Sequence, residues 1–309
     1  MSRSDELTPA DHGLRDRLAS RASLADAALL LSVPAALLAL WSLPAGVRAS
    51  LAFDYAAPTP TTAVLSQFVH LGPTHLAVNL AVYALVVPVA YLLSVLSGHR
   101  RRFRVVFVSL LVVCPLVLPY LNLAIARGGT SVGFSGVLLA LYGYLPLALA
   151  THAEAAFGIG RHRQTAPLLF FVGLALVTVL TLAAVVANPV RVPVRGVVVP
   201  VTGVLVAALA ELVVALALVV ALYAFSTDHG WRGVAADVRA AADRTGEFEV
   251  AAVGLVLFLT VPFATFPTDP VVDGGVLNLY VHLVGYALGF IGSYATVVVE
   301  SRLFGPVGG

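Results

Sequence analysis

Lysine is absent from this chain, and charge of either sign is scarce. Only 11% of the 309 residues are charged and 60% are apolar, whereas soluble domains carry roughly 25% charged residues. This composition predicts an integral membrane protein, in contact with the lipid bilayer and with little soluble mass. The formal net charge of +2 gives no indication of a nucleic-acid partner.

Cysteine is almost absent as well, since Cys114 is the only one. A single cysteine excludes an intrachain disulfide and a thiolate metal cluster. Cys114 lies in an apolar run, which favours core packing. We expect neither a metal nor a cofactor.

The first 23 residues lack the pattern of a secretory signal peptide, which has a short basic start and then an apolar run. They are polar and carry the acids Asp5, Glu6, Asp11 and Asp16. The sequence therefore predicts a cytoplasmic tail over 1–23, followed by a transmembrane domain over 24–309.

Long apolar runs dominate the rest of the chain. A helix needs about 20 mostly apolar residues to cross the hydrocarbon core. Eight segments qualify: 24–45, 75–96, 104–124, 133–150, 166–187, 199–224, 249–266 and 276–298. The sequence therefore predicts an all-α polytopic membrane protein with about eight transmembrane helices.

Arginine placement predicts how these helices are oriented, because cytoplasmic loops are enriched in Lys and Arg. With the N-terminus inside, the outward segments hold Arg48, Arg127, Arg191 and Arg195. The other 14 of the 18 arginines (18 − 4) lie in inward segments. We predict a multi-pass protein of the cell membrane with both termini in the cytoplasm.

A serine stands between glycines where one apolar segment gives way to the next, in Gly133-Phe134-Ser135-Gly136. In the predicted orientation Ser135 lies near the outer face, at the start of an inward-running helix. Small residues at a helix start suit close packing, and a hydroxyl there also suits a nucleophile. The choice depends on whether other helices supply a base and hydrogen-bond donors at the same depth.

His282 lies near the outer end of the last predicted helix, in LNLYVHLVGYALGFIG. An ionisable residue inside a span is costly and is a functional candidate by default. Gly285 and Gly289 share its helical face, where small residues let another helix approach closely. The alternative is a histidine satisfied by a neighbour, above a strip that serves only packing.

His75 and Asn79 lie one helical turn apart at the start of the second predicted helix and share a face. Both can donate hydrogen bonds into a cavity, which suits stabilisation of an oxyanion. Metal ligation is a weaker alternative, because no carboxylate or cysteine accompanies them. A further alternative is that these two residues and His70 merely cap the helix start at the membrane interface.

A nucleophile, a base and donors at the outer ends of three helices are the parts needed for acyl transfer. In this order and spacing the chain resembles the rhomboid family of intramembrane serine proteases. The family pattern is a histidine, H-x-x-x-N, G-x-S-G and H-x-x-G-x-x-x-G. The matching residues are His70, His75-Leu-Ala-Val-Asn79, Gly133-Phe-Ser135-Gly136 and His282-Leu-Val-Gly285-Tyr-Ala-Leu-Gly289.

The resemblance implies a role for each matching residue. Ser135 is the expected nucleophile and His282 the expected general base. His75 and Asn79 are the expected oxyanion site, together with the backbone N–H of Ser135. The expected structural positions near the site are His70, Gly133, Gly136, Gly143, Gly285 and Gly289.

The resemblance also implies a rhomboid-like six-helix core, to which this chain adds a helical pair at about 166–224. The implied function is an intramembrane serine endopeptidase that cleaves transmembrane segments of membrane-protein substrates. We find no acidic residue placed as a third member, so we expect a Ser-His dyad. Two family features are missing: a Trp-Arg pair in the first outer loop, and an aromatic four residues after the serine, where Leu139 stands.

Two other functions stay open. One is a catalytically inactive rhomboid-like protein that binds or escorts membrane proteins. The other is a transporter, in which Glu211, in the middle of an apolar segment, relays ions. Other intramembrane protease classes fit poorly, because the chain has no H-E-x-x-H motif and no pair of helix-embedded aspartates.

Overall fold

The structure is a computed structural model that describes residues 22–124, 128–189, 191–194, 197–226, 239, 246–273 and 275–304. Within these ranges, eight helical segments are long and apolar enough to cross a membrane. The prediction of an all-α polytopic membrane protein is therefore confirmed. Of the predicted tail over 1–23, residues 1–21 lie outside the described residues.

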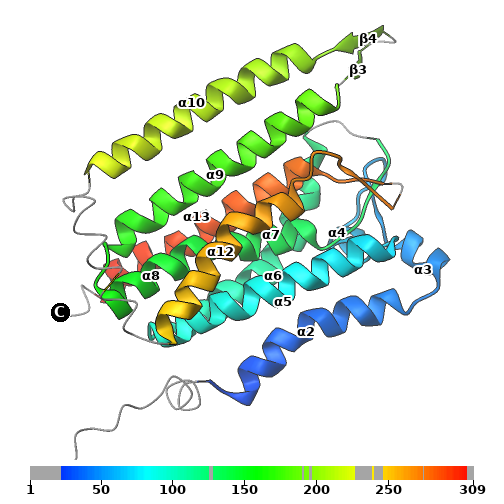
Figure 1. The fold of residues 1–309 in the computed structure, drawn as a ribbon. Coiled ribbons are helices and arrows are strands. Elements are labelled where there is room, and N and C mark those ends of the chain that lie inside the picture. Colours follow the sequence, from blue (N-terminus) through cyan, green and yellow to red (C-terminus); the bar gives the residue numbers. More distant parts are fainter. Residues whose placement is uncertain are drawn as a thin grey trace, which may run out of the picture.

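The spanning segments alternate in direction along the bundle, so their ends gather at its two ends (Figure 1). They are α2 (Leu24–Trp41), α5 (Pro73–Leu96), α6 (Arg100–Leu123), α7 (Ser135–Gly143) continued by α8 (Leu145–Phe157), α9 (His162–Ala187), α10 (Thr202–Ser226), α12 (Glu247–Thr265) and α13 (Leu279–Phe304). Two short helices, α3 (Ala45–Ser50) and α4 (Pro60–Ser66), lie in the loop between α2 and α5. We call the end that carries Ser135 the serine end.

Some predicted boundaries need correction. The fourth span is two consecutive helices separated at Tyr144, and it continues to Phe157 rather than ending near 150. The third begins at Arg100 rather than at 104. Hydropathy locates only the apolar part of a span, whereas backbone hydrogen bonding extends the helix into polar residues beyond it.

Three antiparallel strand pairs in the loops were not predicted from the sequence. β1 (Phe53–Asp54) pairs with β2 (Thr130–Ser131), β3 (Arg191–Val194) with β4 (Val197–Pro200), and β5 (Val271–Val272) with β6 (Gly275–Val276). All three lie at the serine end (Figure 1). The β1–β2 pair ties the first long loop to the loop that leads into Ser135.

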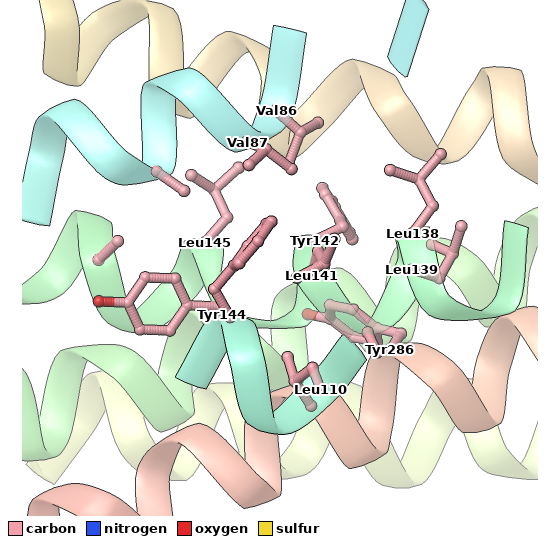
Figure 2. Close-up of a cluster of buried hydrophobic side chains, with 14 of the residues drawn as sticks. Val86, Val87, Leu110, Leu138, Leu139, Leu141, Tyr142, Tyr144, Leu145 and Tyr286 are labelled. Atoms are coloured by element: carbon pink, nitrogen blue, oxygen red, sulfur yellow. The ribbon is translucent and has the colours of Figure 1, made fainter. Parts of the chain in front are cut away.

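The α7–α8 segment forms the centre of the bundle, with 94% of its spanning window buried. Figure 2 shows its large apolar side chains packed between the neighbouring helices. The labelled residues are Leu138, Leu139, Leu141, Tyr142, Tyr144 and Leu145 of α7–α8, Val86 and Val87 of α5, Leu110 of α6 and Tyr286 of α13. Cys114 of α6 is also buried in this core.

Helix α13 lies against α7 with no room for side chains at the closest points. A Cβ atom at Gly285 would lie 2.2 Å from the carbonyl oxygen of Gly136, and one at Gly289 would lie 1.9 Å from that of Ala140. A Cβ atom at Gly143 would in turn lie 2.3 Å from a carbonyl oxygen of α13. These glycines therefore allow the backbone contact that sets the start of α13 beside the start of α7.

The predicted added pair corresponds to α9 and α10, and the two helices differ in their surroundings. Helix α9 packs against α8, and its Phe170 stacks on Tyr286 and Phe290 of α13. Helix α10 packs mainly on α9, and only 6% of its spanning window is buried. Of the pair, α10 alone is peripheral.

Candidate active site

Ser135 and His282 meet at the serine end, although 147 positions separate them in the chain. Ser135 is the first residue of α7, and His282 lies in the first turn of α13. Their Oγ and Nε2 atoms are 2.7 Å apart. The glycine contact between the two helices thus brings together the two residues expected to be nucleophile and base.

The second ring nitrogen of His282 has a hydrogen-bond partner of its own, which defines the tautomer of the ring. Nδ1 lies 2.7 Å from the carbonyl oxygen of Thr265, the last residue of α12. A carbonyl oxygen can only accept, so Nδ1 carries the proton and Nε2 is free to accept the proton of Ser135. A backbone carbonyl orients the histidine here, in the place where a triad has a carboxylate.

Phe266 supports the same imidazole from one side. Its ring meets the ring of His282 edge-on, with centroids 5.6 Å apart and an interplanar angle of 86°. The end of α12 therefore supplies both an acceptor, through Thr265, and an aromatic wall, through Phe266. Leu139, at the position where the rhomboid pattern has an aromatic residue, is fully buried among core side chains (Figure 2). Sequence reasoning missed Phe266 because no fixed spacing relates it to the serine or the histidine.

A cavity of about 510 Å³ lies beside the pair. Ser135 is partly exposed and lines this cavity, so its hydroxyl is accessible from it. The loops at the serine end contribute most of the described lining. The polar side chains among that lining are Tyr55, Gln67, His75, Thr130, Ser131, Ser135, Asp273, Asn278 and His282.

His75 lines this cavity at the start of α5, as the oxyanion assignment requires. Its Nε2 atom is buried and has no hydrogen-bond partner in the described structure. Gly133 leaves space for the ring, because a Cβ atom there would lie 2.4 Å from Cε1 of His75. Gly133 also has φ +118, in the left-handed region that favours glycine. The imidazole therefore packs against Gly133, two residues before Ser135, and its Nε2 atom keeps an unused hydrogen-bonding capacity within the described structure.

Asn79 is placed differently from the expected oxyanion donor. Its Nδ2 atom lies 2.8 Å from Nε2 of His70 and 3.0 Å from the carbonyl oxygen of His75, so both amide hydrogens are used. Asn79 is buried and is not among the described residues that line the cavity. One helical turn separates it from His75, and that turn sets it deeper in the bundle. The geometry therefore supports an indirect role through His70.

His70 is a buried acceptor that joins three segments. Its Nε2 accepts from the Asn79 amide and from the backbone N–H of Phe134 at 3.4 Å. Burial lowers the pKa of His70 to about 3, so the ring stays neutral and keeps this acceptor at neutral pH. Its carbonyl oxygen accepts from Arg48 at 2.7 Å, and that guanidinium stacks 3.9 Å over Trp41. An Arg-Trp pair thus supports the first loop, although the two residues are not adjacent in sequence.

Gln67 is a cavity residue that the sequence did not reveal. Its side chain is 3% exposed, its Nε2 donates to Ser66 at 3.3 Å, and its Oε1 has no partner among the described residues. The backbone N–H of Gly133 donates to the Ser66 carbonyl at 2.9 Å. This contact holds α4 beside the Ser135 loop, and only the folded loop makes that proximity visible.

The described residues thus place a serine hydroxyl, an oriented histidine and a second imidazole around one cavity. Within the described ranges, no group of three or more His, Cys, Asp or Glu side chains is arranged to hold a metal ion. Comparisons with protein-family models, with curated proteins and with solved structures find no match for this chain.

Proposed function

We propose that this chain is a rhomboid-type intramembrane serine endopeptidase that cleaves transmembrane segments of other membrane proteins. The observation that carries the proposal is the 2.7 Å contact between Ser135 Oγ and His282 Nε2, with His282 held as an acceptor by Thr265. A hydroxyl and an oriented imidazole in this arrangement are the working pair of acyl-transfer enzymes.

The proposed reaction begins when Ser135 Oγ attacks a peptide carbonyl in the cavity and its proton passes to Nε2 of His282. The negative charge that develops on the carbonyl oxygen is stabilised by His75 and by the backbone N–H of Ser135. His282 then gives the proton to the leaving amine, and an acyl-enzyme remains. Water attacks this ester, its proton passes to His282, and the proton returns to Ser135 as the acid product leaves.

The proposed substrate is a membrane segment that can unwind near the outer surface. Carbonyl groups of an intact transmembrane helix are hydrogen-bonded within the helix and resist attack. The cavity lies at the end of the bundle rather than at its middle, so a segment unwound near the interface can reach it. We therefore expect small or helix-breaking residues around the cleaved bond.

Cleavage of a single-span substrate in reconstituted membranes is the direct test. Wild-type protein should release two fragments, and Ser135→Ala should release none. Ser293→Ala is the matched control, because its buried hydroxyl donates to the carbonyl of Gly289 within its own helix. Cleavage by Ser135→Ala at the wild-type rate would overturn the proposal.

The proposed location is the cell membrane, with the serine end outside and both termini in the cytoplasm. Single cysteines in a Cys114→Ala background test this orientation. Ser50→Cys and Thr268→Cys lie at the serine end, and Arg161→Cys lies at the opposite end. An impermeant thiol reagent on intact cells should label the first two and spare the third, and the reverse pattern would contradict the orientation.

A further inference from the structure

The loop between α12 and α13 reaches across the serine end to the start of α5. The carboxylate of Asp273 accepts from the backbone N–H of His75 at 3.0 Å, across 198 positions of sequence. Thr74, the residue before His75, also stabilises the charged form of this carboxylate. Asp273 and His75 both line the cavity beside Ser135.

Asp273 supplies a cap that α5 does not provide for itself. The residue before the helix is Gly72, which has no side chain to accept from the unpaired N–H groups of the first turn. A carboxylate at this position also interacts favourably with the helix dipole. The hydrogen bond from the backbone N–H of His75 lowers the pKa of Asp273, so the carboxylate is charged at neutral pH.

Two local features fit this contact closely. A Cβ atom at Gly72 would lie 2.1 Å from Oδ2 of Asp273, so the glycine leaves the space that the carboxylate occupies. Asp273 itself has φ 51, a left-handed conformation that aspartate and asparagine adopt more readily than most residues. The space at Gly72 and the backbone conformation of Asp273 are therefore both compatible with this hydrogen bond.

We propose that Asp273 is a positioning residue, which holds the first turn of α5 and thereby fixes the His75 imidazole beside Ser135. The proposal rests on the proposed function of this cavity. The Nε2 atom of His75 has no hydrogen-bond partner among the described residues, so the position of the ring depends on its packing against His70 and Gly133 and on the backbone that carries it. The segment that carries Asp273 begins directly after Thr265 and Phe266, which orient His282. The end of α12 and the loop that follows it thus contact both histidines.

Four variants separate this role from a general effect on the loop. Asp273→Gly removes the carboxylate and keeps the left-handed backbone accessible, whereas Asp273→Asn keeps the shape and removes the charge. Gly72→Ala keeps Asp273 but occupies the space of its carboxylate. Asp269→Ala is the control, because this exposed acid of the same loop accepts from Val271 within the loop.

The first measurement is kcat and KM for a single-span substrate. Asp273→Gly and Gly72→Ala should lower kcat about tenfold, less than the hundredfold or more expected for losing a whole oxyanion donor. The kcat of Asp273→Asn should lie between the values for these two variants and wild type. The kcat of Asp269→Ala should equal that of wild type. In a His75→Ala background, Asp273→Gly should cause no further loss, since coupled residues are not additive. An equal loss with and without His75 would overturn the positioning role.

The second measurement does not depend on turnover. Amide hydrogen exchange, measured on Ser135→Ala protein, should show the N–H of His75 protected, and Asp273→Gly should speed its exchange about tenfold, as expected when a local opening becomes easier. Unchanged exchange would overturn the contact itself. If Ser135→Ala cleaved as fast as wild type, the proposed function would fail, and the exchange result would still decide whether Asp273 holds α5.

Discussion

The α7–α8 segment and α10 are both spanning segments, but they occupy opposite places in the bundle. The central α7–α8 segment has a mean hydropathy of 1.4 and is 94% buried, whereas α10 has a mean hydropathy of 2.9 and is 6% buried. The more apolar segment is therefore the more exposed one. In a membrane, high hydropathy indicates contact with lipid, whereas the protein interior needs small residues and hydroxyls that allow close approach.

The residues of the two segments follow this difference. α7 begins with Ser135, and its Gly136 and Gly143 lie where α13 approaches most closely. α10 instead presents large apolar side chains outward, among them Leu218 at 61% exposed and Leu222 at 68%. The proposed site begins on the buried α7–α8 segment, whereas α10 faces lipid, so we expect mutations in the two segments to have effects of very different size.

The largest effect is expected at the paired residues themselves. His282→Ala removes the acceptor for the Ser135 proton, and cleavage should fall by about a thousandfold or more. The double variant with Ser135→Ala should be no worse than either single variant, because nucleophile and base act as one unit. Cleavage rates of all three purified proteins give the comparison, and multiplied losses would contradict a shared step.

The next effect is expected at the helix contact below the pair. Gly289→Ala would place a Cβ atom 1.9 Å from the Ala140 carbonyl oxygen, so α13 must move away from α7. Such overpacking costs about 1–3 kcal/mol or more, and the displaced His282 should also reduce cleavage strongly.

Gly292→Ala is the control on the same helix, because a Cβ atom there has no heavy atom within 4 Å. Thermal unfolding in detergent and the cleavage rate should both be close to wild type for this variant. Equal losses at Gly289 and Gly292 would show that the close contact of α13 with α7 does not support the site.

The sequence predicted the parts of this structure that follow from local patterns. Apolar run length identified eight spans, and motif spacing selected Ser135, His282 and His75, which the fold brings to one cavity. It did not indicate Gln67 or Asp273, because each depends on a loop contact between distant segments. The same limit applies to Asn79, since a shared helical face does not tell which residue reaches the cavity and which lies beneath it.

A smaller effect than that of the Ser135–His282 pair is expected at His75 and Asn79. His75→Ala removes a side chain that lines the cavity, and cleavage should fall about a hundredfold. Asn79→Ala removes the hydrogen bond to His70 and should lower the cleavage rate less, about tenfold. This change disturbs how the site is positioned but removes no side chain that lines the cavity. Rates for both variants, measured with the same substrate, would contradict this order if Asn79→Ala were the more damaging.

The smallest effect is expected at Glu211, in the peripheral helix α10. Its side chain is exposed and has no hydrogen-bond or ion-pair partner within the described structure, so its loss breaks no contact there. Glu211→Gln keeps the size of the side chain and should change cleavage by less than about twofold, as for other exposed sites.

A transporter that relays protons through this carboxylate predicts the opposite pattern. Proton uptake into vesicles would fall in Glu211→Gln and persist in Ser135→Ala. Measuring cleavage and proton uptake on both variants therefore separates the two functions. A large loss of cleavage in Glu211→Gln would show that α10 supports the site, and the contrast between centre and edge would no longer hold.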